Sequence, residues 1–304
     1  MKPINPSGIY FIKLGPGGEW EERCVEQEQT IRLGFNDANH ADCIAGNWEK
    51  IRQSYLTSRT AGKATEFANQ IKLFYTRDAQ TVWVTFYANH MWWCFADEKV
   101  VPQPDGTKIR KVVGQWSNKD IAGKPLSLDS LSGKLTQVRG FRGTICGIKE
   151  LQYAVDRING KLSPSVSIAI EAKKTLEMSL LSLIQNLTWG DFEILVDLVF
   201  SQAGWQRVGV LGKTEKDWDL DLLAPVTGER ALVQVKSRSD GKEFRRYVNE
   251  FRQSKQHTRL FFIAHSITGD LPVSEPYVNF VGPAELAELV VNAGLSAWLI
   301  KKNS

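Results

Sequence analysis

The sequence lacks the features that mark several large classes of protein. Its four cysteines are widely spaced and none forms a CxxC pair, so we expect neither a zinc site nor a disulfide framework. No apolar run approaches the roughly 20 residues of a membrane span, and the start, MKPINPSGIYF, does not resemble a signal peptide. No GxxxxGK[ST] loop is present, so we expect no use of ATP. These absences predict a reduced, soluble, cytoplasmic protein without a membrane partner.

A strong charge of one sign is also missing. The 304 residues carry a net charge of +4, with 42% hydrophobic and 24% charged residues, which is ordinary for a globular chain of two domains. The charge is uneven, however: between Lys236 and Arg259, eight Lys and Arg residues stand against three Asp and Glu. Such a run is most often a solvated helix face, and a nucleic-acid contact is the alternative.

The stretch Lys216–Ser239 predicts a β-hairpin. Asp217, Asp219 and Asp221 alternate on its first strand, so they project from one face, because side chains in a strand alternate with a period of two. Pro225–Gly228 supplies the turn. Like charges on one face repel each other unless a cation lies among them, which favours a metal site over three solvated carboxylates.

The second strand of this hairpin, Ala231–Lys236, places Gln234 and Lys236 on one face. Aspartates on one strand opposite a Gln-x-Lys on its neighbour bring oxygen ligands and a fixed cation near one point. Hydrolysis of a phosphodiester needs such a pair: an ion that activates water, and positive charge near the transition state.

These residues resemble the PD-(D/E)xK nuclease superfamily. Asp221 is followed thirteen residues later by Gln234-Val235-Lys236, and glutamine in the acidic position is typical of the Mrr-type restriction endonucleases. The segment Thr188–Gly204, TWGDFEILVDLVFSQAG, is similar to the opening helix of that branch. The resemblance covers roughly residues 188–265. It implies an αβββαβ, restriction-endonuclease-like domain over residues 188–304.

The resemblance also implies roles for particular residues. It implies metal coordination by Asp221 (with Asp219 as the alternative), Glu193 and the backbone carbonyl of Val235, and further catalytic roles for Gln234 and Lys236. These oxygen ligands indicate Mg²⁺, with Mn²⁺ able to replace it. Lys236 would orient or deprotonate the attacking water, or stabilise the developing charge. Double-stranded DNA is the expected partner, and the expected phosphate contacts are Arg238, Arg245, Arg246, Arg252 and Lys255.

The first half of the chain predicts a smaller mixed domain. We expect strands at 8–14, 30–35, 109–116 and 138–145, helices at 42–55 and 62–75, and a hairpin over 81–95. A polar stretch from Asn159 to Ser167 marks the linker, and a helix is expected from Ile168 to Leu187. The predicted division is therefore 1–158, a linker and connecting helix at 159–187, and 188–304.

The hairpin of this first domain is rich in aromatic residues. Trp83, Tyr87, Trp92, Trp93 and Trp116 are most simply core residues, and a cage that holds a base between aromatic faces is the alternative. Neighbouring Trp92 and Trp93 cannot both face inward unless both faces of that strand are covered or the strand is bulged. The opening GIYFIKLGPGGEW and the aromatic set weakly resemble PUA-like modules, including the EVE and YTH groups that read modified bases, so this curved-sheet or barrel-like domain would recognise DNA.

Together these patterns and the family resemblances predict a two-domain protein of α+β and α/β class with a restriction-type endonuclease activity. A domain that recognises modified DNA joined to a domain that cleaves DNA would suit a modification-dependent enzyme. We expect such an enzyme to be homodimeric and to act in prokaryotic antiphage defence. Two alternatives stay open: a repair or recombination nuclease on the same fold, and a DNA-binding protein whose nuclease domain is inactive.

Overall fold

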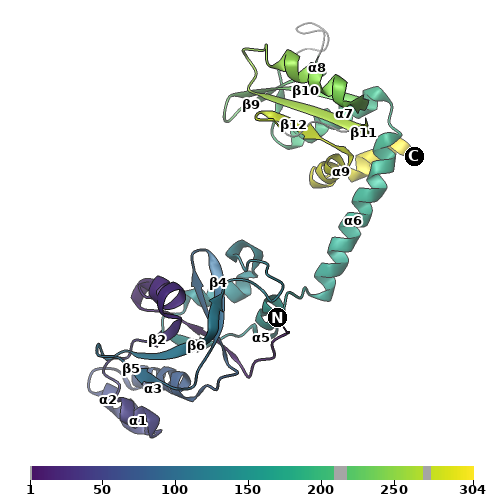
Figure 1. Ribbon diagram of the computed structural model, residues 1–304. Helices are drawn as coiled ribbons and strands as arrows, with labels where there is room; N and C mark the ends of the chain where they lie inside the picture. Colours follow the sequence, from purple (N-terminus) through teal and green to yellow (C-terminus); the bar gives the residue numbers. More distant parts are fainter. Residues whose placement is uncertain (1, 209–217, 270–274) are drawn as a thin grey trace. The chain divides into compact units, whose positions relative to one another are not determined.

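The chain folds into two compact units, Met1–Pro164 and Ser165–Ser304, each with its own sheet and helices. The computed structural model describes residues 2–208, 218–269 and 275–304 (Figure 1). Both units mix helices with strands, as the sequence predicts. None of the helices in these ranges is long and apolar enough to cross a membrane. The predicted division of roles between the units stays a prediction.

The first unit is built on a curled sheet of seven strands in the order β2-β6-β4-β3-β1-β7, with β5 paired to β6. Its strands are β1 (Ile9–Ile12), β2 (Thr30–Leu33), β3 (Val82–Tyr87), β4 (His90–Ala96), β5 (Val101–Pro102), β6 (Lys108–Ser117) and β7 (Ile145–Gly147). Only β1 and β3 run parallel; the other pairs are antiparallel. The predicted hairpin is β3–β4, and Ala88 and Asn89 turn it with positive φ.

Short helices connect these strands. They are α1 (His40–Ile44), α2 (Trp48–Leu56), α3 (Ala61–Thr76), α4 (Gly133–Thr136) and α5 (Leu151–Ile158), with 3₁₀ turns at Pro16–Gly18, Leu128–Ser130 and Gln137–Gly140 and a π-helical turn at Arg23–Glu28. The single helix expected over 42–55 is two helices, because Gly46 breaks it with a φ of 73°.

The prediction of a strand over residues 138–145 is wrong. Its first part is a 3₁₀ turn, and only Ile145–Gly147 pairs with β1. The side chain of Gln70 explains where pairing begins: its Oε1 accepts the backbone N–H groups of Thr144 and Ile145, at 3.0 Å for the latter. The segment is thereby fixed to α3 before it enters the sheet.

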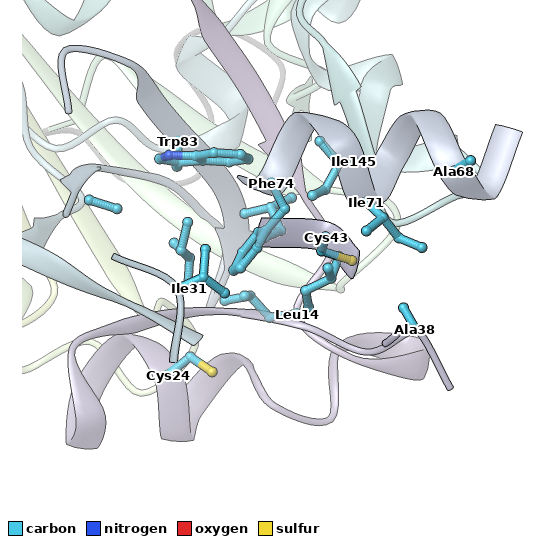
Figure 2. Close-up of a cluster of buried hydrophobic side chains, with 14 of the residues drawn as sticks. Leu14, Cys24, Ile31, Ala38, Cys43, Ala68, Ile71, Phe74, Trp83 and Ile145 are labelled. Carbon is cyan, nitrogen blue, oxygen red and sulfur yellow. The ribbon is translucent and has the colours of Figure 1, made fainter. Parts of the chain in front are cut away.

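Both faces of this curled sheet are covered by side chains. On one face Trp83 is fully buried and packs on Phe74 of α3, with ring centroids 6.0 Å apart (Figure 2). On the other face Trp93 is buried in a second cluster with Phe11 and Phe86. The neighbour of Trp93 therefore turns to the first face, so a strand buried on both sides accommodates two adjacent tryptophans.

The second unit has a five-stranded sheet in the order β12-β11-β10-β9-β8. Its strands are β8 (Gln206–Arg207), β9 (Leu220–Ala224), β10 (Glu229–Asp240), β11 (Arg259–Thr268) and β12 (Val278–Val281). β10, β11 and β12 run parallel, and β8, β9 and β10 run antiparallel. With the helices, the chain order is α7-β8-β9-β10-α8-β11, the αβββαβ order that the resemblance implies. Sequence analysis missed β8 and β12, which are only two and four residues long.

Helices cover both faces of this second sheet (Figure 1). They are α6 (Pro164–Gln185), α7 (Trp189–Gln202), α8 (Gly241–Phe251), α9 (Pro283–Asn292) and α10 (Ser296–Asn303). The aromatic residues of α8 pack on one face, and α6, α7, α9 and α10 pack on the other. Thr188 is the N-cap of α7, because its side chain accepts the backbone N–H of Asp191.

Replacing Trp83 with alanine tests whether this ring is a core residue. Because the indole is fully buried, Trp83→Ala should destabilise the first unit by about 3–5 kcal/mol. Thermal melting of the full chain measures this loss. Trp189→Ala, at a side chain that is 73% exposed on α7, is the control and should change stability little. A folded Trp83→Ala protein with normal stability that only lost DNA affinity would contradict the core role.

Candidate active site

The candidate site lies where β9 and β10 separate. Their pairing ends with Leu220 opposite Val233, and the backbone N–H of Asp219 still donates to the carbonyl of Val233 at 3.2 Å. Beyond this point β10 continues toward its C-terminal end paired with β11 on its other side. Asp219 therefore lies beside Gln234 and Val235 rather than inside the ladder.

Asp219 is held by two donors from β10. Its Oδ2 accepts the backbone N–H of Val235 at 2.7 Å and a short hydrogen bond from the side-chain amide of Gln234. Glu193 of α7 lies close enough to the Asp219 carboxyl group for each to shift the pKa of the other. Arg207 of β8 donates to the backbone carbonyl of Asp219 at 3.3 Å. One strand and one helix thus contact this carboxylate, and a second strand holds the backbone carbonyl of the same residue.

Gln234 is nearly fully buried, yet one of its polar atoms has no partner. Its nitrogen donates to Asp219, and its Oε1 has no hydrogen bond within the described residues. Buried polar atoms are rarely left without partners, because desolvation then goes uncompensated. This oxygen therefore fits a ligand that accepts electron pairs, such as a metal ion.

The two carboxyl groups of the site disfavour being charged together. Burial raises the pKa of Asp219, and the hydrogen bond from Val235 and the charge of Lys236 oppose this only in part. Burial and the nearby Asp219 raise the pKa of Glu193, against the opposing charges of Arg207 and Lys236. A pair of desolvated carboxylates is stable in the charged form when a cation lies between them. Across the described residues, no three His, Cys, Asp or Glu side chains gather at ligand spacing, so backbone and amide oxygens would complete any coordination.

Lys236 supplies the fixed positive charge. Its Nζ lies 3.7 Å from Glu243 Oε1 and 5.3 Å from the centre of the Tyr247 ring, both on α8. Burial alone would lower the pKa of Lys236, but Tyr247, Glu243 and Asp219 outweigh that effect and raise it. The amine therefore stays protonated at neutral pH, which favours charge stabilisation over proton abstraction among the roles predicted for it.

Asp221, the first choice for a metal ligand from the sequence, has other contacts. It projects from the same face as Asp219 but lies two residues further along β9, and a short ion pair joins it to Arg230. His257 Nε2 lies 3.1 Å from its other oxygen, and Ser254 contacts the far side of that ring at 2.8 Å. The structure thus brings the alternative, Asp219, to the Gln-x-Lys strand. Asp217 lies outside the described residues.

The predicted phosphate-binding cations are all exposed on the second unit. They are Arg238, Arg245, Arg246, Arg252 and Lys255. Two of them are engaged within the unit: Arg246 lies over the Tyr247 ring and 3.7 Å from Glu250, and Arg252 pairs with Glu275. Because α8 begins directly after β10, its exposed arginines extend the positive surface away from Lys236.

Sequence analysis missed three contributors to the site. Arg207 lies on a two-residue edge strand, which has no detectable pattern. Glu243 and Tyr247 are four residues apart on α8, so they share one helix face, and that spacing directly after the Gln-x-Lys strand is a usable signal.

The predicted base-reading aromatic residues do not form one cage. Trp83, Trp93 and Trp116 are buried in the two cores of the first unit. Tyr87 and Trp92 are half-buried, with ring centroids 6.2 Å apart, and Glu26 contacts the Tyr87 hydroxyl. A carboxylate at this place disfavours a nucleic-acid backbone.

The element order and the paired acids beside a Gln-x-Lys strand define a restriction-endonuclease-like domain in the second unit. A family model described as "Restriction endonuclease" (Mrr_cat) matches residues 184–270, less than a third of the chain. This segment is therefore a restriction endonuclease domain, consistent with the Mrr-type domain of the PD-(D/E)xK superfamily that the resemblance implies. No curated protein and no solved structure matches the chain.

The two aspartates should respond oppositely to neutralisation. Without metal, Asp219→Asn should raise the melting temperature, because it removes a buried charge next to Glu193 while an amide oxygen still accepts from Val235. Asp221→Asn should lower stability by about 1.5–3 kcal/mol, because it weakens charged hydrogen bonds to Arg230 and His257. Thermal melts in EDTA measure both shifts.

The pH dependence of these melts supplies the control. A carboxyl group whose pKa is raised by folding stabilises the protein below its ordinary pKa of about 4, and that contribution is lost as pH rises through the folded-state value. The stability of the metal-free wild type should therefore fall with rising pH in this range, and Asp219→Asn should flatten the fall. An equal fall in stability in both proteins would mean that a group other than Asp219 has the raised pKa.

Proposed function

We propose that the second unit hydrolyses phosphodiester bonds of double-stranded DNA with a divalent metal ion. Asp219, Glu193, the Oε1 of Gln234 and the backbone carbonyl of Val235 would hold the ion. The observation that carries this proposal is the buried Gln234 oxygen, which has no hydrogen bond to any described residue and lies beside two carboxyl groups with raised pKa. A set of hard oxygen donors favours Mg²⁺, with Mn²⁺ as a substitute.

The side chains around this site have separate tasks. When bound, the ion would lower the pKa of a water molecule and offset negative charge on the phosphate. Lys236 remains charged and places its amine near the same phosphate, so it stabilises charge that develops there. Glu243 and Tyr247 hold that amine in place from α8. The five exposed cations would contact phosphates and position the duplex without reading its sequence.

The full chain would act as a restriction enzyme that depends on DNA modification. Support comes from the match of its second unit to restriction endonucleases and from a separate first unit with its own sheet. Cleavage by a unit with one metal site leaves one strand intact, so we propose that two copies act together as a homodimer. Defence against foreign DNA in the cytoplasm is the setting that such an activity fits.

Replacing Lys236 tests the catalytic assignment. Lys236→Ala should reduce plasmid cleavage by about 100-fold or more, because one preorganised charge is lost from the reacting phosphate. Nicking and linearisation are followed on gels with Mg²⁺, Mn²⁺ or EDTA, and EDTA should abolish cleavage by the wild type.

The matched control for this experiment is Lys301→Ala, an exposed lysine on α10. It should cut as the wild type does. Cleavage that Lys236→Ala leaves unchanged would refute the site, and DNA binding without metal-dependent cleavage in the wild type would favour the inactive DNA-binding alternative.

Plasmids of several modification states test the proposed dependence on modification. Wild-type protein should cut one state at least tenfold faster than unmodified DNA with Mg²⁺ present. Equal rates on all states would remove modification dependence while leaving the nuclease in place. A preference for branched or damaged DNA over every intact plasmid would instead favour the repair or recombination nuclease.

A further inference from the structure

The first unit contains a pocket that none of the predicted base-reading aromatic residues lines. Its volume is about 500 Å³, within the range of small-molecule sites. It is lined by Lys13, Gly15, Pro16, Gly17, Glu19, Trp20, Gly34, Phe35, Asn36, Arg142, Gly143 and Thr144. The ends of β1 and β2 and the segment before β7 therefore surround it.

The indole of Trp20 is an aromatic wall of this pocket with a fixed orientation. A Cβ atom at Gly15 would lie 2.8 Å from the indole Cδ2, and one at Gly34 would lie 2.9 Å from Cη2, so both glycines allow the backbone to approach the ring. The Arg32 guanidinium carbon lies 5.8 Å from the ring centroid. Trp20 is only half-buried. One ring, held by its neighbours and still open to the pocket, suits the stacking of a planar ligand.

The lining segment before β7 is also held in place by hydrogen bonds. Lys13 Nζ donates to the backbone carbonyl of Phe141 at 2.7 Å. Gln70 binds the backbone N–H of Ile145 at 3.0 Å and that of the preceding residue. At Gly143 a Cβ atom would lie 2.6 Å from the Phe141 ring. The pocket is thus formed before any ligand arrives, so binding costs little ordering of the protein.

The charges of the lining residues favour an anionic group beside the planar one. Lys13 and Arg142 are cations, and Glu19 is the one acid among the lining residues. Asn36 offers both a donor and an acceptor for the edge of a heterocycle. An aromatic wall, an amide and a small excess of positive charge match a nucleotide, whose base is flat and whose phosphate is negative.

We propose that this pocket binds one nucleotide of the DNA substrate, with its base turned out of the duplex and stacked on Trp20. The inference rests on the proposed function and adds the place where the first unit recognises DNA. Extrusion of a base costs a few kcal/mol, which stacking and hydrogen bonds in such a pocket offset. A free nucleotide has the same chemistry as a nucleotide within DNA, so the experiment distinguishes these two ligands.

The experiment uses the full chain with Lys236→Ala, because the expected loss of cleavage leaves DNA binding to be measured by itself. Fluorescence anisotropy compares a fully paired duplex with duplexes that carry one abasic site opposite a natural or modified base, because an unpaired base is extruded at lower cost. Calorimetry measures binding of the free mononucleotides. We expect tighter binding of a duplex with the unpaired base, and about tenfold or greater loss of this preference in Trp20→Ala.

Two further variants keep the test valid if Trp20→Ala does not fold. Gly34→Ala moves the indole without removing it, and Arg142→Glu reverses a charge at the exposed rim. Both should weaken duplex binding. Arg59→Glu, the same change at an exposed arginine of the first unit outside the pocket lining, is the matched control and should bind as the parent does.

The outcomes separate this inference from the proposed nuclease. If the Trp20, Gly34 and Arg142 variants bind every duplex as the parent does, the pocket has no role in DNA recognition and the inference is overturned, even when the wild type cuts DNA. If the free mononucleotide binds as tightly as the duplex, a small-molecule ligand replaces the extruded base. If wild-type protein cuts no DNA but the Trp20-dependent preference is present, the nuclease proposal fails and the pocket assignment stands.

Discussion

The candidate nuclease site depends on the point where two paired strands separate. Inside the ladder, neighbouring strands occupy the backbone donors, whereas beyond Leu220 the N–H of Val235 is available to a side chain. Asp219 uses this donor and the Gln234 amide, so it enters the protein interior beside Glu193. Desolvation there raises the pKa of both carboxyl groups. A divalent cation between the two carboxyl groups would stabilise their charged forms and so offset this desolvation.

A second constraint governs the first unit. Its sheet is covered on both faces, so most strand aromatic residues fill the cores, and the indole of Trp83 is fully buried. Trp20 differs because it follows a glycine-rich turn instead of lying in a strand, and Gly15 and Gly34 bring the backbone against its ring. An aromatic ring available to a ligand thus comes from a connecting segment.

Several elements could be predicted because their signals are local. The hairpin of β9 and β10 follows from strand alternation and turn residues, and helix-cap chemistry explains Thr188 before α7. The αβββαβ order, by contrast, was implied only by the family resemblance. The same local signals failed for the segment 138–145, where the long-range contact with Gln70 decides when pairing begins. Arg207 lies on a strand too short for any periodicity.

The sequence by itself determined the nuclease-like domain and the Gln-x-Lys strand, because both depend on residue spacing. It could not choose between Asp219 and Asp221, since strand alternation gives both the same face. Only the tertiary structure decided, by placing Arg230 and His257 against Asp221 and leaving Asp219 to β10 and α7. Alternation along one strand determines the face from which each side chain projects. A metal or base site, however, is formed by contacts between residues far apart in the chain.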